Sequence, residues 1–268
     1  MKLTAEVLNG VPALPGVYRF LDGDGAVLYV GKAMRLSRRL GQYKAAGRRR
    51  QHRRMKRIVA RAATLVWEVT ATHLDACLLE IRLIQELRPP LNVAGAYSFL
   101  YPYISFTQPP AGPFSLALTT RPELFPEAMH HGAFRSRDVC VEAVFALARL
   151  LSLIGHREPD RAAARAKRPR GTYVFAFRRL PAGWPELWRD FLRGRSAAAL
   201  TELSLALLEH AGARARSGEI QADLAAVRRL YDDEILPLEA ALTKAGGSGA
   251  YPVAQCDRDP LFIELRLG

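Results

Sequence analysis

Two short β-rich runs on either side of an Asp/Gly segment constrain the fold of this chain more than any other feature. The two runs are residues 17–20 and 26–30, and the Asp/Gly segment between them is residues 22–25. Asp-Gly pairs between runs rich in valine and aromatic residues are typical of a β-hairpin turn. The hairpin would bring Tyr18, Tyr29 and Lys32 close together, directly before an arginine-rich segment. Phenols and cations in this arrangement favour phosphodiester cleavage as a first hypothesis.

Basic residues are concentrated in the N-terminal third of the chain. The chain carries 39 Lys+Arg against 26 Asp+Glu, a net charge of +13, and residues 1–96 hold 17 basic and 7 acidic residues, or +10 of that total. From Arg35 to Arg61 there are 12 basic residues and no acidic one. Such a tract indicates a polyanionic partner, because neutralised phosphates release counterions. The tract by itself also fits RNA, an acidic membrane or a solvated helix face. The arginines predicted to contact DNA are Arg35, Arg38, Arg48, Arg49, Arg50, Arg53 and Arg54.

The hydrophobic pattern predicts three segments. A chain of 268 residues with 49% hydrophobic content suits one large or two modest domains with their own cores. The predicted segments are an α/β unit over residues 1–96, an extension and linker over 97–170, and a mainly helical domain over 171–268. Helices are predicted over 35–43, 51–63, 74–87, 139–154, 184–194, 197–215 and 219–242, and further strands over 65–70, 101–106, 114–118 and 171–177. Pro89 ends the third helix, and Pro237 should end or kink the last one.

The cysteines and the N-terminus indicate a reducing compartment. Cys77, Cys140 and Cys256 are widely spaced, and the absence of a CxxC pair argues against zinc and iron–sulfur sites. The first residues lack an apolar signal core, and no stretch reaches the roughly 18 apolar residues that a membrane helix needs. We therefore expect a cytoplasmic protein with no membrane partner.

Glu80 is the candidate metal ligand, because it interrupts an otherwise apolar helix. An acidic residue in that position is either buried and paired or kept for function. One carboxylate completed by water molecules suits Mg²⁺, and a metal-assisted hydrolase also needs a base and cations. Taken singly, Tyr18 and Tyr29 would be core or interface aromatics, and Lys32 and Arg39 would be surface charges. Their occurrence together is what favours catalysis.

An ordered set of motifs over residues 12–96 resembles the GIY-YIG nuclease family. The motifs are Gly16-Val17-Tyr18, Leu28-Tyr29-Val30-Gly31-Lys32-Ala33, Arg39, Tyr43, Leu79-Glu80 and Arg88-Pro89-Pro90-Leu91-Asn92-Val93. Within the family the chain is most similar to the N-terminal incision domain of the excinuclease protein UvrC, because Lys32-Ala33 and Tyr101-Pro102-Tyr103-Ile104 are features of that branch. The resemblance implies an α/β (α+β) fold, in which a small three-stranded antiparallel sheet is flanked by helices and followed by a mainly helical region.

The resemblance also implies the catalytic roles. Glu80 would hold a single Mg²⁺ or Mn²⁺ ion on the phosphate. Tyr29 would be the general base for the attacking water, and Lys32, Arg39 and the ion would each favour its phenolate form. Arg39 would stabilise charge on the phosphoryl group.

The remaining motif residues would support these groups. Tyr18 and Tyr43 would hydrogen-bond to the water or the phosphate. Asn92 would hold the local geometry near the helix that carries Glu80. The implied partner is double-stranded DNA that contains damage.

Beyond the nuclease unit the resemblance is weaker. Residues 132–154 look like the segment that follows the nuclease in UvrC proteins, and residues 191–195 and 223–229 look like the stretch that leads into their partner-binding helices. The cysteine cluster of many UvrC proteins is absent, so no iron–sulfur cluster is expected. The Arg-Asp ending of the partner-binding motif is Arg229-Leu230 here, so the excinuclease protein UvrB is a candidate partner whose docking motif departs from the family pattern. The chain as a whole resembles the short standalone homologue of UvrC, which makes only the incision on the 3′ side of damage.

Three functions remain open at this point. The first is a metal-dependent DNA endonuclease that makes the 3′-side incision in nucleotide excision repair. The second is a structure-specific nuclease on branched or flapped DNA, because the nuclease unit alone does not encode the substrate. The third is a non-catalytic nucleic-acid-binding protein, against which the complete catalytic set argues.

Overall fold

In the computed structural model, the Asp/Gly segment turns the chain as predicted. The Asp22 carboxylate accepts hydrogen bonds from the backbone N–H groups two and four residues later, at 3.1 and 2.8 Å. Gly25 adopts a φ of +84°, a backbone conformation that residues with a Cβ atom rarely adopt. The turn joins β1 (Gly16–Leu21) to β2 (Val27–Ala33), and β3 (Thr64–Val69) pairs with the other edge of β1. The sheet order is therefore β2-β1-β3, all antiparallel, with β2 at an edge.

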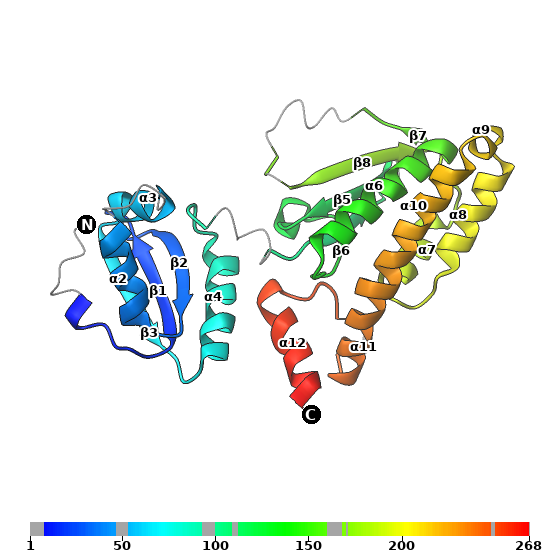
Figure 1. The fold of residues 1–268 in the computed structure, drawn as a ribbon. Coiled ribbons are helices and arrows are strands. Elements are labelled where there is room, and N and C mark those ends of the chain that lie inside the picture. The colour runs from blue at the N-terminus through cyan, green and yellow to red at the C-terminus, as the bar shows by residue number, and fades with distance from the viewer. Residues whose placement is uncertain are drawn as a thin grey trace. The chain divides into compact units, whose positions relative to one another are not determined.

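The structure describes residues 8–46, 53–92, 100–108, 112–159, 168–169, 171–247 and 250–267. The chain divides into two compact units, Met1–Leu100 and Tyr101–Gly268 (Figure 1). Three of the arginines predicted to contact DNA, Arg48, Arg49 and Arg50, lie outside the described residues.

Helices cover both faces of the three-stranded sheet (Figure 1). They are α2 (Leu36–Ala46) and α3 (Arg53–Arg61) on one face and α4 (His73–Leu87) on the other. A reciprocal pair of hydrogen bonds between Thr72 and Asp75 caps the start of α4, and the helix ends at Arg88, directly before two prolines. The predicted small antiparallel sheet flanked by helices is confirmed.

Side-chain alternation divides this unit into two apolar layers. Tyr18, Phe20 and Tyr29 pack with the residues of α2 and α3, whereas Val17 and Val30 pack against α4. Successive residues of a strand point to opposite faces, so Tyr29 and Val30 lie on opposite sides of the edge strand β2.

The second unit is built on a five-stranded antiparallel sheet of order β6-β4-β5-β8-β7. Its strands are β4 (Tyr103–Thr107), β5 (Phe114–Thr119), β6 (Met129–His131), β7 (His156–Arg157) and β8 (Tyr173–Arg178), and a 3₁₀ turn, η1, covers Pro122–Leu124. Its helices are α6 (Arg137–Ile154), α7 (Trp184–Leu192), α8 (Ala198–Glu209), α9 (Ala211–Arg214), α10 (Ser217–Leu230), α11 (Leu236–Lys244) and α12 (Gln255–Leu267), with a π-helical segment, η2, at Tyr231–Ile235. None of the helices that the structure describes has the length and apolar character of a membrane span.

The second unit differs from its prediction in two respects. The boundary predicted at residue 170 falls inside this unit, because β8 pairs with β5 and both contribute to one apolar core. The helix predicted over 219–242 is divided by η2, and Pro237 lies in the first turn of α11, where a missing N–H is tolerated. The helical run is thus interrupted before this proline, which lies inside α11 and does not end it.

Candidate active site

Glycine in β2 makes room for two phenol rings. β1 and β2 pair in a register that places Tyr18 opposite Gly31. A Cβ atom on Gly31 would lie 2.5 Å from the Tyr18 hydroxyl oxygen and 2.9 Å from a ring carbon of Tyr29. Gly16, at the start of β1, is equally constrained, because a Cβ there would overlap the carbonyl oxygen of Glu68. Both glycines are required by the close approach of neighbouring atoms.

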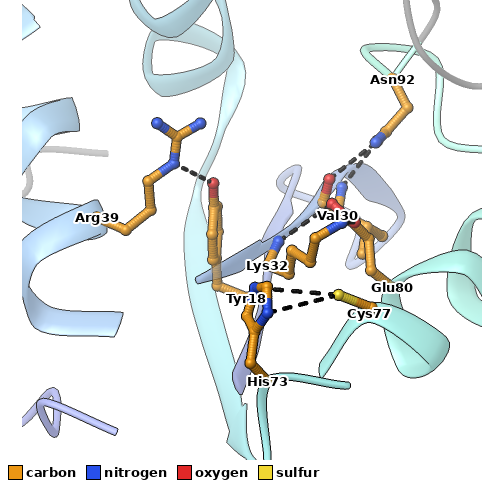
Figure 2. A network of polar contacts seen from close by, with 8 residues as sticks. All are labelled: Tyr18, Val30, Lys32, Arg39, His73, Cys77, Glu80 and Asn92. Carbon is orange, nitrogen blue, oxygen red and sulfur yellow. Dashed lines mark hydrogen bonds and ion pairs between the residues drawn. The ribbon is translucent and has the colours of Figure 1, made fainter. Parts of the chain in front are cut away.

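Tyr18, Tyr43 and Arg39 form a hydrogen-bonded cluster on one side of β2, and Figure 2 shows the contact of Arg39 with Tyr18. The hydroxyl groups of Tyr18 and Tyr43 are 3.1 Å apart, and Arg39 Nε donates to the Tyr18 hydroxyl at 3.1 Å. The Tyr29 ring lies beside them, with its centroid 6.2 Å from that of Tyr18. Arg39 Nη1 donates to Gln42 at 2.9 Å, and its planar guanidinium can donate several hydrogen bonds at once. The structure thus brings together Tyr18, Tyr43 and Arg39, three of the residues named from the sequence.

Burial keeps two of these phenols protonated. It raises the pKa of Tyr18 to about 12, assisted by the nearby Tyr29, although the positive charge of Arg39 acts in the opposite direction. Burial and the neighbouring Tyr18 raise the pKa of Tyr43 still further above its ordinary value. Tyr18 and Tyr43 are therefore hydrogen-bond donors, not bases, at neutral pH.

Glu80 and Lys32 form an ion pair on the other side of the edge strand (Figure 2). Lys32 Nζ donates to Glu80 Oε2 at 2.5 Å, and the backbone N–H of Lys32 donates to Oε1 at 3.1 Å. Burial alone would lower the pKa of the Lys32 ammonium, but the hydrogen bond to Glu80 and the charge of that carboxylate outweigh it, so the pKa is raised. The sequence left open whether Glu80 is paired or functional, and the structure is compatible with both, since its partner Lys32 also lines a cavity.

The residues around Glu80 fit a divalent ion that keeps most of its water. The described residues contain no group of three or more His, Cys, Asp or Glu side chains able to hold a metal. A single carboxylate is compatible with Mg²⁺, which commonly binds through one or two carboxylates together with waters and substrate phosphate. The Lys32 ammonium donates a hydrogen bond to Glu80 Oε2, so it would compete with such an ion for that carboxylate oxygen.

The Asn92 side chain hydrogen-bonds to the backbone of β2 at the edge of the sheet. Its amide nitrogen donates to the Val30 carbonyl at 2.8 Å, and its amide oxygen accepts from the Val30 N–H at 2.8 Å. The N–H of Leu91 donates to the Leu28 carbonyl at 2.9 Å, so the segment after α4 runs along the strand. Asn92 is therefore a positioning residue for the strand that carries Tyr29 and Lys32.

A cavity of about 450 Å³ is lined by one residue from each of these two groups, Arg39 and Lys32. Its lining residues are Lys32, Ala33, Met34, Arg35, Arg38, Arg39, Gln42 and His73. Two of the arginines predicted to bind DNA and one predicted to be catalytic thus face one hollow surface. Arg54 has a different place, because its guanidinium lies 5.3 Å from the centre of the Tyr29 ring and donates to the Leu91 carbonyl at 3.2 Å. Arg53 is exposed on α3.

Sequence reasoning missed Gln42 and His73, and it did not anticipate the contact of Arg54 with the Tyr29 ring. Gln42 is one helical turn after Arg39, a spacing that could have indicated the contact. The place of His73 in the cavity lining and the ring contact of Arg54 have no local signal. Both depend on packing between segments that are distant in sequence.

The fold and this arrangement define a GIY-YIG endonuclease domain, and residues 14–93 match the family model of the UvrC-like GIY-YIG domain. One similar relative is UvrABC system protein C of Rhodopseudomonas palustris, which is 32% identical over 257 residues; these residues are 90% of this chain and 34% of that protein. Another is UvrABC system protein C of Rhizobium etli, which is 42% identical over 106 residues, or 40% of this chain and 15% of that protein. The chain spans about a third or less of the lengths of these relatives.

A solved structure also matches the first unit. It is the GIY-YIG N-terminal endonuclease domain of UvrC from Thermotoga maritima bound to its catalytic divalent cation, magnesium. The identity is 36%, the TM-score is 0.30, and the match covers 32% of this chain and 92% of that one. The family predicted for residues 12–96 is confirmed by the match over residues 14–93.

Proposed function

We propose that the chain is a metal-dependent DNA endonuclease that makes the incision on the 3′ side of damage in nucleotide excision repair. The observation that carries this proposal is a cationic cavity lined both by Arg39, which bonds to Tyr18 of the Tyr18–Tyr43 pair, and by Lys32, which pairs with Glu80. The naming of relatives as UvrABC system proteins supports the repair context. Double-stranded DNA with damage is then the substrate, and the excinuclease protein UvrB is a candidate partner.

The residues divide the chemistry among them. Glu80 would hold one Mg²⁺ or Mn²⁺, which when bound neutralises charge on the phosphate and the leaving oxygen. Tyr29 takes a proton from the attacking water. Arg39 donates to the phosphoryl oxygens, and Tyr18 and Tyr43, being protonated, orient the water or phosphate by hydrogen bonds.

The test is incision of a lesion-bearing duplex in Mg²⁺, with and without the excinuclease proteins UvrA and UvrB. Glu80→Gln should abolish incision and leave DNA affinity nearly unchanged, because the amide keeps the shape but loses the charge that binds the ion. Glu86→Gln, an exposed change on the same helix, is the matched control and should cut at the wild-type rate. Unchanged incision by Glu80→Gln would remove Glu80 from the mechanism.

The same assay separates the alternatives. Faster cleavage of flaps and junctions than of damaged duplex would favour a structure-specific nuclease. Binding without metal-dependent nicking would favour a non-catalytic nucleic-acid-binding protein. Incision mapped to the 5′ side of the lesion would contradict the proposed polarity.

A further inference from the structure

Met34 places apolar surface inside a cationic cavity. Its side chain is 67% exposed, the largest value for a large hydrophobic residue in the described part of the chain. It nevertheless lines the cavity of about 450 Å³ together with Lys32, Arg35 and Arg38. Neither core packing nor charge explains a methionine at this position.

The connection that carries Met34 is held at both ends. On one side Ala33 is paired with Gly16 in the sheet. On the other side the N–H of Leu36 donates to the Leu14 carbonyl at 3.0 Å, and α2 begins there. The exposure of Met34 therefore belongs to a fixed turn, and the side chain is presented in a defined place.

Two exposed leucines lie at the same end of the sheet. Leu14, whose carbonyl anchors α2, is 52% exposed, and Leu74 is 55% exposed and follows His73, which lines the cavity. Covering an exposed apolar side chain with a partner is favourable, because it removes apolar surface from water. The partner of this cavity must therefore offer apolar surface next to negative charge.

A nucleic-acid strand has both properties at the spacing of one nucleotide. Its phosphates match Lys32, Arg35 and Arg38, and the faces of its bases are apolar and aromatic, which suits a flexible thioether. Apolar side chains, methionine among them, act as wedges between base steps in proteins that deform DNA. The positive charge of the cavity favours nucleic acid over an apolar protein surface as the partner.

We propose that Met34 inserts against the base beside the scissile phosphate and unstacks it. This inference rests on the proposed function, because it takes DNA as the substrate. Unstacking turns the strand so that its phosphate can enter the cavity between Lys32 and Arg39. Met34 then selects DNA whose bases unstack easily, as they do near a lesion, and it acts as a positioning residue that takes no part in proton transfer.

The direct test measures base unstacking without cleavage. The full chain carrying Glu80→Gln is added at saturation to duplexes in which 2-aminopurine occupies, in turn, each position around a lesion. We expect a fluorescence rise at one or two adjacent positions, lost when Met34→Ala is added. Leu87→Ala, an exposed leucine of α4 outside the cavity lining, is the matched control and should keep the rise. A rise that persists with Met34→Ala, or its absence with Glu80→Gln alone, overturns the proposal.

Incision rates give a second measurement. In the otherwise wild-type chain, Met34→Ala should slow incision about tenfold on a paired duplex, the loss expected for one apolar contact, and less than about threefold when the bases at that step are mismatched. Met34→Leu should restore most of the rate. Equal slowing on both substrates overturns the wedge, as does loss of binding to UvrB with no change on DNA.

The two proposals fail in different ways. A Met34-dependent fluorescence rise with no incision by the wild-type chain would contradict the proposed nuclease function and keep the base contact. Incision at the wild-type rate by Met34→Ala on paired duplex would contradict the base contact and keep the nuclease.

Discussion

Tyr18 and Tyr43 share a hydrogen bond in the apolar layer between the sheet and α2, and neither ionises near neutral pH. Burial raises the pKa of Tyr18 to about 12, and its effect exceeds that of Arg39, which lowers it. A tyrosine with a raised pKa holds its proton until the pH approaches that value. The chemistry proposed for these two side chains is therefore donation of hydrogen bonds, which supports giving the proton transfer to Tyr29.

The first residue-scale prediction separates Tyr29 from Tyr18. Tyr29→Phe keeps the ring and removes the hydroxyl, so incision should fall by the roughly 10²–10⁴-fold typical of a lost general base. The dependence of the incision rate on pH should also change in Tyr29→Phe, because the group that takes the proton is gone. Tyr18→Phe should cost less and keep the shape of the wild-type profile, because Tyr18 stays protonated to about pH 12. A wild-type profile retained by Tyr29→Phe would place the base elsewhere.

The second residue-scale prediction concerns the Lys32–Glu80 pair. Lys32→Ala leaves the buried residue Glu80 without its cation, so the free energy of unfolding should fall by about 1–3 kcal/mol without added metal. The thermal shift on adding Mg²⁺ should be larger in Lys32→Ala than in the wild type, because the ammonium no longer competes for Oε2. Calorimetry with and without Mg²⁺ measures both quantities. Lys32→Arg, which keeps the charge, is the control, and an equal or smaller Mg²⁺ shift in Lys32→Ala would contradict the competition.

At the scale of elements, the site depends on an edge strand that is held along its length. β2 supplies Tyr29, Gly31 and Lys32, and edge strands present unpaired backbone groups. Asn92 satisfies two such groups on Val30, between Tyr29 and Gly31. The side-chain amide thus makes hydrogen bonds to the backbone of β2 that a fourth strand would otherwise make.

This arrangement gives an element-scale prediction. Asn92→Ala should lower the free energy of unfolding of the first unit by about 1–3 kcal/mol, because it leaves two buried backbone groups unpaired. Amide hydrogen exchange at Val30 should speed up in the same variant. Asn92→Asp keeps an acceptor for the Val30 N–H but turns a carboxylate oxygen toward the Val30 carbonyl, so it should not recover the stability lost in Asn92→Ala. Unchanged exchange at Val30 would show that the edge of β2 is held by other contacts.

How far the sequence predicts the elements depends on how local each signal is. The hairpin, α4 with its prolines, and the break before Pro237 follow from turn and stop residues that act within a few positions. The pairing of β8 with β5 has no such signal, and it joins segments that were predicted to be separate. The same holds for Glu234, which the π-helical segment turns toward the start of α6, where it accepts from the N–H groups of Arg135 (2.6 Å) and Ser136 (2.9 Å).

The candidate site follows the same division. The motif spacing was sufficient to select Tyr18, Arg39 and Glu80, because strand register and helix turns bring them to β2. The ion pair of Glu80 with Lys32 depends on how α4 packs on the sheet, and packing distances are not encoded in a local pattern. The sequence does not single out Met34 for a similar reason, since its exposure is a property of the folded surface.

At the scale of the whole molecule, charge is divided unequally between the two units. Residues 1–96 carry 17 basic and 7 acidic residues, a net of +10, whereas the rest of the chain carries 22 and 19, a net of +3. In the described part of the second unit many arginines are already paired with carboxylates, among them Arg178 with Glu158 and Arg216 with Glu219. The first unit is therefore expected to supply most of the electrostatic attraction to DNA.

The last prediction tests this division through salt dependence. Affinity for duplex DNA should fall steeply with salt, and replacing Arg48, Arg49 and Arg50 together with alanine should flatten the slope of log K against log salt by up to about 2.7, or about 0.9 for each phosphate that is no longer neutralised. The motivation is the acid-free tract from Arg35 to Arg61. Replacing Arg178, Arg195 and Arg216 changes the net charge equally, but each is paired with a carboxylate, so the slope should stay within about 1 of the wild type. Equal flattening by both triple variants would mean that net charge alone sets the affinity, and an unchanged slope in the first would show that the tract faces away from DNA.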